Sequence, residues 1–335
     1  MAKPVVLNFV LGAPAEYFTK EFYNKYEVRS NPLKGAVNKD ELISIIKDVD
    51  ATIAGVEPYT REVYEAAQKL KIVARYGVGY DSVDVAEATK FGIFATILPG
   101  INAETVAEHT VALIFAAVRN LVSVAKDTKP DTWTNISMRY YSTEAPFELY
   151  GKTLGIVGFG AIGATVSRIC SGLNMKIIIY DPYVNIDKAR QAKAELVGLE
   201  RLLRESDVIT VHSPLNKETR HMLGEKEFRL MKKTAIIVNA ARGPVIDEQA
   251  LYTALKERWI AVAGLDVLEK EPPEPNNPLF TLDNVIVTPH IAGSSIENFI
   301  RCDAMLEIQI DQALRGEVPK FALNPEAINY RPKLK

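Results

Sequence analysis

Three residues in the second half of the chain are of the types that could bind an anionic substrate and move a proton. They are Arg242, Glu271 and His290, and each lies just beyond a predicted β-strand. The planar guanidinium of an arginine binds a carboxylate through two hydrogen bonds, and beside a carbonyl it stabilises negative charge that develops on the oxygen. A histidine can give or take a proton near neutral pH, and an adjacent carboxylate stabilises its charged form and fixes its tautomer. The three residues therefore indicate acid/base chemistry on a substrate that carries a carboxylate.

A glycine-rich segment, Gly158-Phe159-Gly160-Ala161-Ile162-Gly163, matches the G-x-G-x-x-G pattern of dinucleotide-binding proteins. It follows a predicted strand and opens a predicted helix that runs to about Ser171. In such a segment the first glycine permits a tight turn, the second lets the backbone approach a pyrophosphate, and the third lets the helix pack on the strand. The N-terminus of the helix adds free N–H groups. We therefore expect cofactor contacts from Gly158, Gly160, Ala161, Ile162 and Gly163.

Asp181 ends the next predicted strand, at the place where dinucleotide-binding folds carry an acidic residue. A carboxylate there accepts hydrogen bonds from the ribose hydroxyls, and its charge repels a 2′-phosphate. The sequence therefore predicts that the cofactor is NAD rather than NADP, with Asp181 as one of its ligands.

Short apolar strands alternate with helical patterns throughout this half of the chain. Six strands in this rhythm are typical of a doubly wound parallel sheet, in which the carboxyl ends of the strands meet at one edge. The arginine, the carboxylate and the histidine are therefore expected at the same edge as the cofactor. The predicted strands are Thr153–Val157, Lys176–Tyr180, Asp207–His212, Ala235–Asn239, Ala261–Asp266 and Val285–Thr288.

The first hundred residues show the same alternation, which predicts βαβ units and a second, mostly parallel sheet. The expected strands are Val5–Val10, Ala51–Ala54, Ile72–Tyr76 and Ile93–Thr96, and the expected helices lie near Glu41–Lys47, Glu62–Leu70 and Ser82–Lys90.

Between these halves, residues 103–125 form one long helical pattern that is apolar on nearly every side. Such a helix must be buried, either between domains or against another subunit. The aromatic stretch Trp133–Tyr150 is predicted to be irregular, and a last helix is predicted over Ser295–Leu314, with a tail that returns to the first domain.

Composition excludes several classes of protein. A chain of 335 residues predicts about two domains at roughly 150 residues each. A formal charge of −2 offers no cationic field for nucleic acid or anionic lipid, so we expect neither as a partner. The apolar run Val111–Val118 is far shorter than the about 20 residues that span a bilayer. The two cysteines, Cys170 and Cys302, are far apart and suit a reducing cytoplasm, and no cluster of residues has the spacing of a metal site.

Three segments, together with the glycine-rich motif and Pro99-Gly100, resemble the D-2-hydroxyacid dehydrogenase family. The resemblance covers essentially the whole chain. The family patterns N-A-x-R-G, D-x-x-x-x-E-P and P-H-x-A-G are matched at residues 239–243, 266–272 and 289–293.

The resemblance implies a reaction and a role for each of the three residues. Arg242 would bind the substrate carboxylate and polarise the keto oxygen, His290 would be the acid/base, and Glu271 would be its partner. The reaction would be reversible hydride transfer between NAD(H) and a small 2-hydroxy or 2-keto acid.

The resemblance also implies two Rossmann-like, doubly wound domains. A flavodoxin-like substrate domain would be discontinuous, over residues 1–102 and 296–335, and residues 103–295 would form the NAD-binding Rossmann domain. A homodimer would be built on the helix near residues 103–125. Further cofactor contacts are expected from His212, Pro214, Ala240, Asp266 and Gly293, whereas Glu269 is expected to be a solvated charge and His109 and His221 to be structural.

The segment Arg75-Tyr76-Gly77-Val78-Gly79 in the first domain is similar to the family's substrate loop, whose backbone N–H groups hold the carboxylate. Arg75 could pair with a substrate phosphate, which would favour 3-phosphoglycerate, or Glu57 in the neighbouring loop could neutralise it. Both substrate classes remain open. The expected substrate-binding residues are Arg75, Tyr76, Gly77, Val78, Gly79 and Arg242.

Other functional classes follow from the same resemblance. Members of this fold act as NAD-sensing transcriptional corepressors, so a binding protein is an alternative that turnover of a keto acid would exclude. Formate-oxidising relatives carry glutamine where this chain has Glu271, which argues against formate as substrate.

Overall fold

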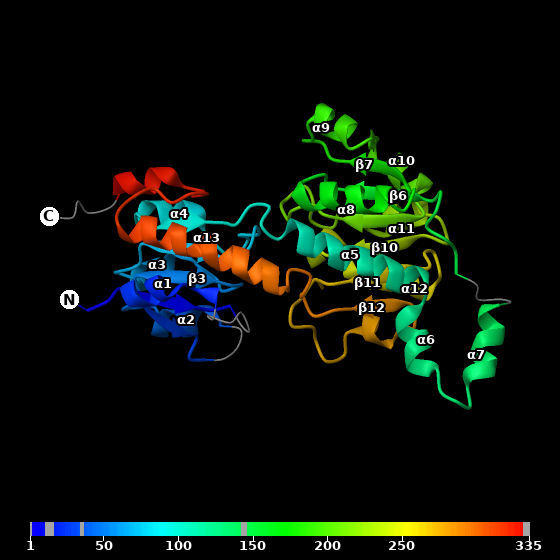
Figure 1. The fold of residues 1–335 in the computed structure, drawn as a ribbon, viewed down its shortest axis with the longest axis horizontal. Coiled ribbons are helices and arrows are strands. Elements are labelled where there is room, and N and C mark those ends of the chain that lie inside the picture. Colours follow the sequence, from blue (N-terminus) through cyan, green and yellow to red (C-terminus); the bar gives the residue numbers. More distant parts are fainter. Residues whose placement is uncertain (1, 11–16, 34–36, 142–145, 331–335) are drawn as a thin grey trace. The chain divides into compact units, whose positions relative to one another are not determined.

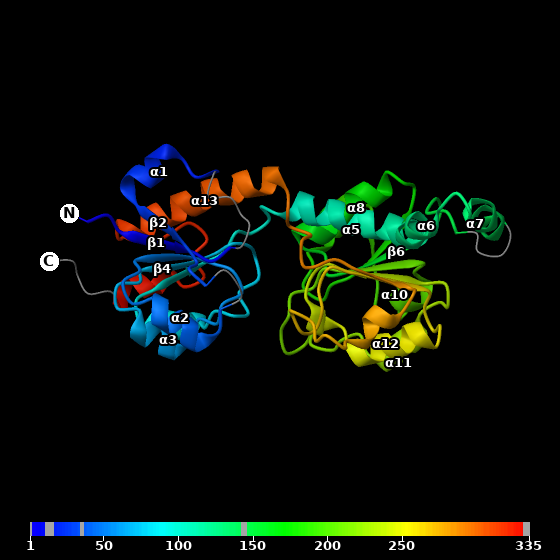
Figure 2. The ribbon, with the colours of Figure 1, turned by 90° about the horizontal axis from the view of Figure 1, so that it is seen from below.

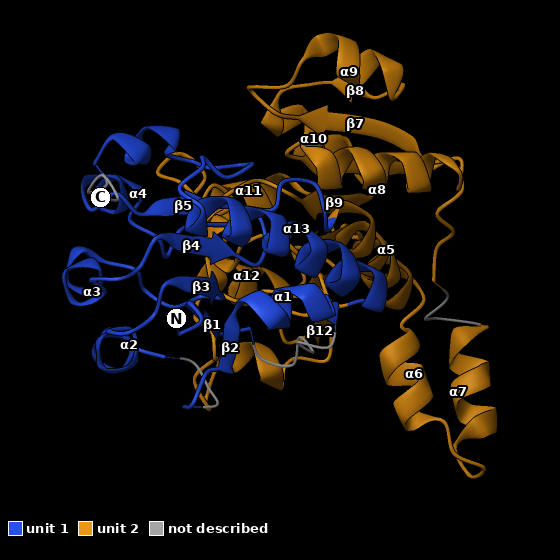
Figure 3. Ribbon diagram, turned by 60° about the vertical axis from the view of Figure 1, so that its left-hand side comes forward, with its two compact units in different colours: residues 1–102, 295–335 blue, residues 103–294 orange. Residues whose placement is uncertain are grey.

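The chain forms two compact units in a computed structural model, residues 1–102 with 295–335 and residues 103–294 (Figures 1 and 3). The structure describes residues 2–10, 17–33, 37–141 and 146–330. Each unit contains a parallel β-sheet with helices on both faces. The prediction of two doubly wound α/β domains is therefore confirmed.

The sheet of the first unit has five strands in the order β2-β1-β3-β4-β5, and every neighbouring pair is parallel. This is the order of flavodoxin-like sheets. The strands are β1 (Val5–Asn8), β2 (Glu27–Ser30), β3 (Ala51–Ala54), β4 (Ile72–Arg75) and β5 (Phe94–Thr96).

Helices cover both faces of this sheet because successive side chains of the buried strands point to opposite sides. One core contains side chains of α2, α3 and α4, and the other contains side chains of α1 and α13. In the ribbon, α2 and α3 lie on the face of the sheet opposite α1 and α13 (Figure 2). The helices are α1 (Lys20–Lys25), α2 (Lys39–Ile45), α3 (Arg61–Ala66), α4 (Val85–Lys90) and α13 (Ile296–Leu314).

The segment that follows α13 folds onto the edge strand of this sheet. Buried Asn324 accepts a hydrogen bond from the Ala95 amide at 2.8 Å and donates to the Ile93 carbonyl and the Thr89 hydroxyl, both at 2.9 Å. A 3₁₀ segment, Pro325–Tyr330, follows. The tail is thus part of the first unit.

The sheet of the second unit has seven strands in the order β12-β11-β10-β9-β6-β7-β8, again with every neighbouring pair parallel. Its strand order reverses between β6 and β9, where Rossmann folds bind their cofactor. The strands are β6 (Thr153–Val157), β7 (Lys176–Tyr180), β8 (Glu195–Leu196), β9 (Val208–Val211), β10 (Ile236–Asn239), β11 (Val262–Leu265) and β12 (Val285–Val287).

Two cores sandwich this sheet as well. Side chains of α5, α8 and α9 pack on one face, and side chains of α10, α11 and α12 pack on the other. In the ribbon, α5 and α8 lie on the face opposite α10, α11 and α12 (Figure 2). The helices of this unit are α5 (Ala103–Val118), α6 (Leu121–Asp127), α7 (Trp133–Tyr140), α8 (Ala161–Ser171), α9 (Ile186–Gln191), α10 (Leu199–Glu205), α11 (Glu225–Leu230) and α12 (Glu248–Lys256), with 3₁₀ segments at Gly243–Val245 and Pro278–Thr281.

The structure corrects the prediction of one long helix over residues 103–125. Asn120 adopts left-handed backbone angles, with φ of 50°, so α5 ends at Val118 and α6 begins at Leu121. The two helices are bent by 59°. α5 is buried within its own unit, against α8 and the sheet, whereas no residue of α6 or α7 is buried.

Four short elements were not predicted, namely α1, β2, β8 and α7. α1 is only six residues long and buries a single one of them, Phe22. β2 and β8 lie at sheet edges and expose much of their side chains, so neither carries the apolar pattern of a buried strand. α7 lies in the stretch that was predicted to be irregular, and its exposed residues likewise carry no burial signal.

In the described part of the chain, no single helix has the length and hydropathy of a membrane span. Only α5 and α6 taken together reach that length, across their bend.

Candidate active site

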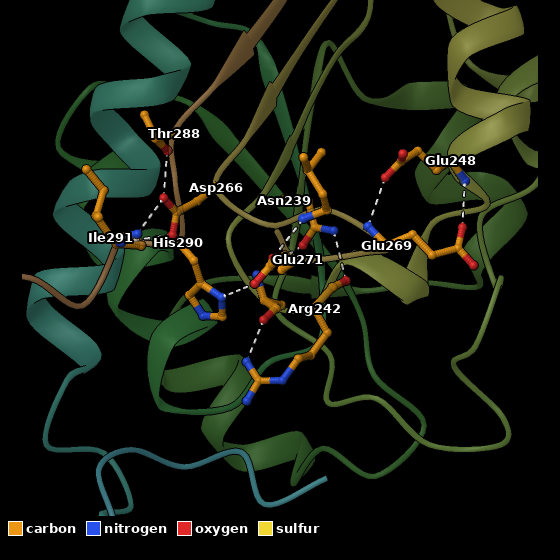
Figure 4. A network of polar contacts seen from close by, with 12 residues as sticks. Asn239, Arg242, Glu248, Asp266, Glu269, Glu271, Thr288, His290 and Ile291 are labelled. Atoms are coloured by element: carbon orange, nitrogen blue, oxygen red, sulfur yellow. Dashed lines mark hydrogen bonds and ion pairs between the residues drawn. The ribbon is translucent and has the colours of Figure 1, made fainter. Parts of the chain in front are cut away.

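Arg242, Glu271 and His290 follow three strands that are neighbours in the second sheet. Arg242 follows β10, Glu271 lies in the loop after β11, and His290 follows β12 (Figure 4). Parallel strands place these loops at one edge. The structure therefore brings together the three residues in which the sequence predicts acid/base chemistry.

His290 and Glu271 form a hydrogen-bonded pair. The Nδ1 atom of His290 lies 2.6 Å from Oε2 of Glu271, and the second carboxylate oxygen accepts the Leu268 amide at 2.9 Å. Both carboxylate oxygens are thus engaged, which fixes the carboxylate and makes Nδ1–H the donor. The Nε2 atom is then left for proton exchange with a substrate.

Asp266 holds the turn that carries His290. Its side chain is 1% exposed, and its oxygens accept the amides of Ile291 at 2.9 Å and Ala292 at 2.8 Å, and the Thr288 hydroxyl at 2.6 Å. The main-chain oxygen of Asp266 also accepts the His290 amide at 2.8 Å. Asp266 therefore forms hydrogen bonds to the turn before His290, at His290 and after it.

The charge on Asp266 follows from this environment. Burial alone would raise the pKa of its carboxyl group, but the nearby His109 side chain and hydrogen bonds from Thr288 and the two amides outweigh burial and hold the pKa below its ordinary value. Asp266 is therefore ionised at neutral pH. The anion offsets the cost of holding His290 in left-handed backbone angles, with φ of 54°, which are unfavourable for a residue with a side chain.

A second turn, after β10, carries Arg242. The Asn239 side chain accepts the Ala241 amide and donates to the Arg242 carbonyl, both at 3.0 Å, and a guanidinium nitrogen of Arg242 donates to the Ala241 carbonyl at 2.7 Å. A Cβ atom on Gly243 would overlap the Leu268 carbonyl. Only glycine lets the Arg242 turn pack directly on the loop that carries Glu271.

The glycine-rich segment has the geometry of a dinucleotide cradle. Gly158 has φ of 92°, and a Cβ atom there would lie 2.7 Å from the Ser213 amide nitrogen, so this position needs glycine. A Cβ on Gly163 would overlap the Gly158 carbonyl, so the third glycine brings the helix onto the strand. Around Gly160 no atom lies within 4 Å of such a Cβ, and no side chain caps α8 there. The residues present therefore fit a pyrophosphate at the α8 N-terminus, beside Ala161 and Ile162.

Asp181 links the end of β7 to this cradle. Its two carboxylate oxygens accept the amides of Phe159 and Tyr183, each at 2.8 Å. This places a negative charge beside the glycine turn, where the ribose of a dinucleotide would lie.

The remaining predicted cofactor residues lie on loops or strand ends of the same unit. His212 and Pro214 follow β9, and Ala240 packs with Ala292, which precedes Gly293. Burial lowers the pKa of His212 to about 4. His212 is therefore neutral at physiological pH and does not compete with His290 as a proton donor.

In the first unit, Arg75 supports the glycine loop that follows β4. Its side chain is buried, and it donates to the Gly79 carbonyl at 2.7 Å and the Ala54 carbonyl at 2.8 Å. Glu57 is buried nearby, where burial raises the pKa of its carboxyl group and the Arg75 charge opposes that shift. Arg75 is thus directed into the protein, and it holds the backbone of the loop.

The loop itself presents unused donors. Gly77 has φ of 144°, and among the described residues the amides of Gly77, Val78 and Gly79 donate no hydrogen bond. The Tyr76 hydroxyl instead points into the first unit, towards Asp303 and Cys302 of α13. Successive free amides form a concavity that binds an anion.

Several residues gain roles that the sequence analysis missed. Glu269 was expected to be solvated, but its Oε1 atom lies 2.6 Å from Nε2 of His221. Glu269 and Glu248 also each accept a hydrogen bond from the other's main-chain amide, so Glu269 anchors the loop that carries Glu271. Gly243 could have been found from its place in the N-A-x-R-G pattern. The roles of Thr288 and His109 depend on contacts between distant segments and left no local signal.

Comparison with known proteins agrees with this geometry. Residues 111–292 match a sequence model described as D-isomer specific 2-hydroxyacid dehydrogenase, NAD binding domain. A glyoxylate reductase of Korarchaeum cryptofilum is 45% identical over 296 residues, which are 88% of this chain and 89% of that protein. A D-3-phosphoglycerate dehydrogenase of Methanocaldococcus jannaschii is 42% identical over 301 residues, 89% of this chain but 56% of that protein. The holo D-mandelate dehydrogenase of Rhodotorula graminis has a TM-score of 0.83 at 28% identity, covering 96% of this chain and 98% of that one.

The charge of Asp181 gives a prediction about cofactor choice. We expect the protein to bind NADH at least about tenfold more tightly than NADPH, a difference of about 1.4 kcal/mol, because a 2′-phosphate beside Asp181 would bring like charges together. Asp181→Asn should narrow this ratio, measured by titration of nicotinamide fluorescence. Asp187→Asn, which removes an exposed carboxylate on α9, is the matched control and should leave the ratio unchanged. Equal affinities in the unmodified protein would contradict the assignment.

Proposed function

The chain belongs to the D-isomer specific 2-hydroxyacid dehydrogenase family, and from that premise we propose that its substrate is glyoxylate or another small 2-keto acid without a phosphate. It is an NAD-dependent oxidoreductase that interconverts 2-hydroxy and 2-keto acids. The observation that carries the proposed chemistry is the 2.6 Å contact between His290 and Glu271.

Each site residue has a proposed part in the reduction. When bound, NADH supplies the hydride that adds to the carbonyl carbon. Arg242 binds the substrate carboxylate and stabilises the negative charge on the carbonyl oxygen. His290, protonated on both ring nitrogens, gives the Nε2 proton to that oxygen, and the product is the 2-hydroxy acid. Glu271 keeps Nδ1 protonated, so that Nε2 is the atom that exchanges its proton in both directions.

The preference for an unphosphorylated substrate is supported by the position of Arg75. A phosphate ligand would need this guanidinium at the surface, but the residue is only 8% exposed and its guanidinium donates to carbonyls of its own loop and of β3. We propose that Arg75 shapes the loop and that the free amides of Gly77, Val78 and Gly79 bind substrate oxygens. Glyoxylate reductases from several archaea are 38–45% identical to this chain.

The alternative is 3-phosphoglycerate, and the relatives that support it are longer proteins. The chain spans 56% and 55% of the two D-3-phosphoglycerate dehydrogenases, from Methanocaldococcus jannaschii and Archaeoglobus fulgidus.

We also propose that the protein is a cytoplasmic homodimer, assembled through α6 and α7. Neither helix buries a residue, yet the segment exposes large apolar side chains, among them Leu121, Val122, Trp133, Met138 and Tyr141, with Trp133 67% exposed. Exposed apolar clusters of this kind mark interaction surfaces. Sedimentation analysis should give twice the chain mass for the unmodified protein and a smaller mass for Trp133→Ser.

The His290–Glu271 pair predicts the pH dependence of the reaction. Reduction needs protonated His290 and oxidation needs it neutral, so the reductive rate should fall with rising pH while the oxidative rate rises. Glu271→Gln removes the charge that stabilises the imidazolium, so reduction should fail at a lower pH than in the unmodified enzyme. The measurement is a set of pH–rate profiles in both directions.

Two further variants complete this experiment. Glu274→Gln removes an exposed carboxylate that pairs with Lys270 rather than with His290, so the midpoints of the pH profiles should stay in place. His290→Ala should cost roughly 10²–10⁴ in rate, the usual contribution of a positioned general acid. An upward shift in Glu271→Gln, or a normal rate in His290→Ala, would mean that the proton passes through another group.

Substrate choice is tested with two keto acids that differ only in a phosphate. We expect kcat/KM for hydroxypyruvate to exceed that for 3-phosphohydroxypyruvate by about tenfold or more, because Arg75 is engaged within the protein. Glyoxylate should be reduced as well. A preference for the phosphorylated acid would reverse the substrate assignment, and turnover of none of the three would favour a protein that only binds NAD.

A further inference from the structure

His109 lies on α5 and reaches the turn that carries His290 from outside the three catalytic loops. Its Nε2 atom is 3.1 Å from the Thr288 hydroxyl oxygen and 3.5 Å from Oδ1 of Asp266. All of these residues belong to the second unit. The sequence analysis gave His109 only a structural role on an apolar helix.

The direction of the hydrogen bonds in this chain can be deduced. Asp266 is ionised and can only accept, so the Thr288 hydroxyl donates its single hydrogen to Oδ1 at 2.6 Å. The Thr288 oxygen can then only accept from His109, which requires a hydrogen on Nε2. The donors therefore run in one direction, from His109 to Thr288 to Asp266.

The same carboxylate binds both residues after His290. Oδ1 accepts the Thr288 hydroxyl and the Ile291 amide, and Oδ2 accepts the Ala292 amide. The orientation of the Thr288 hydroxyl thus sets how the Asp266 carboxylate faces the turn. His109 in turn fixes the Thr288 hydroxyl, since it supplies the only donor that the described contacts place on that oxygen.

We propose that His109 is a positioning residue for the reaction, which acts through Thr288 and Asp266 to hold the backbone turn of His290. The proposal rests on the proposed acid/base role of His290. The turn needs such support because His290 has left-handed backbone angles and its imidazole is 43% exposed, so surrounding side chains do little to hold it. A small displacement of the turn lengthens the contact to Glu271, and errors near 1 Å in a reacting group can cost about 10²-fold in rate.

The test uses three substitutions on or beside this chain of donors. His109→Phe keeps a ring but removes the donor, and His109→Gln restores an N–H at similar reach. Thr110→Val is the matched control, because its buried hydroxyl, one residue along α5, donates only within the helix, to the Val106 carbonyl.

We expect His109→Phe to lower kcat for keto-acid reduction on the order of tenfold and to move the alkaline limb of the reductive pH profile to lower pH. The charged groups around His290 in that comparison are Glu271, its direct partner, the buried Asp266 carboxylate that binds its turn, and Arg242 on the loop after β10 (Figure 4). The limb should move because the looser turn weakens the contact to Glu271. His109→Gln should recover most of both effects, and Thr110→Val should show neither.

Amide hydrogen exchange separates this proposal from the proposed function. Exchange at Ile291 and Ala292 should rise in His109→Phe, with strands β6 and β9 unchanged, whether or not His290 carries the proton. If His109→Phe leaves both the exchange at Ile291 and Ala292 and the alkaline limb of the pH profile unchanged, the role of His109 is overturned. The role is also overturned if His109→Phe and Thr110→Val lower the rate equally. A His290→Ala enzyme of normal rate would instead contradict the proposed function.

Discussion

The ionised carboxylate of Asp266 is the constraint on which the catalytic edge of the second sheet depends. A charge that is 1% exposed is stable only if it is fully hydrogen-bonded, and here it is satisfied mainly by donors from one turn, Thr288, Ile291 and Ala292. The carboxylate therefore holds the turn in place, and the hydrogen-bond donors of the turn in return stabilise the buried charge. Since the pKa is lowered in the folded protein, this contribution to stability is complete above the ordinary pKa of an aspartate and is lost as pH falls through the lowered value.

Close backbone contacts at two glycines extend this constraint to the neighbouring loops. Gly243 lets the turn of Arg242 lie directly on the loop of Glu271, and Gly158 lets the cofactor turn lie on the residues after β9. A side chain at either position would push the loops apart. The proton donor, the carboxylate ligand and the cofactor cradle are thus held by backbone packing between adjacent strand ends, which is more rigid than contact between flexible side chains.

The sequence predicts the buried part of this fold well, because buried strands and glycine turns leave local patterns. The strands Thr153–Val157, Lys176–Tyr180 and Ala51–Ala54 are predicted with the bounds that the structure shows. The exposed strands β2 and β8 and the break at Asn120 leave no such pattern, since exposed residues are free to vary and a single left-handed asparagine has no required neighbours. Motifs located Arg242, Glu271 and His290, but the network of Asp266 joins segments more than 20 residues apart. The inward direction of Arg75, which decides between two classes of substrate, is likewise set by tertiary packing.

Hydrogen exchange in an Asp266→Asn variant tests the central claim most directly. The substitution keeps the size of the side chain and one acceptor but removes the charge. Charge-assisted hydrogen bonds contribute about 1.5–3 kcal/mol, so protection of the Ile291 or Ala292 amide should fall by about tenfold or more, while the amides of β6 and β9 keep theirs. Protection that stays the same at both amides would show that the turn of His290 is held by something other than the Asp266 carboxylate, and the account would be wrong.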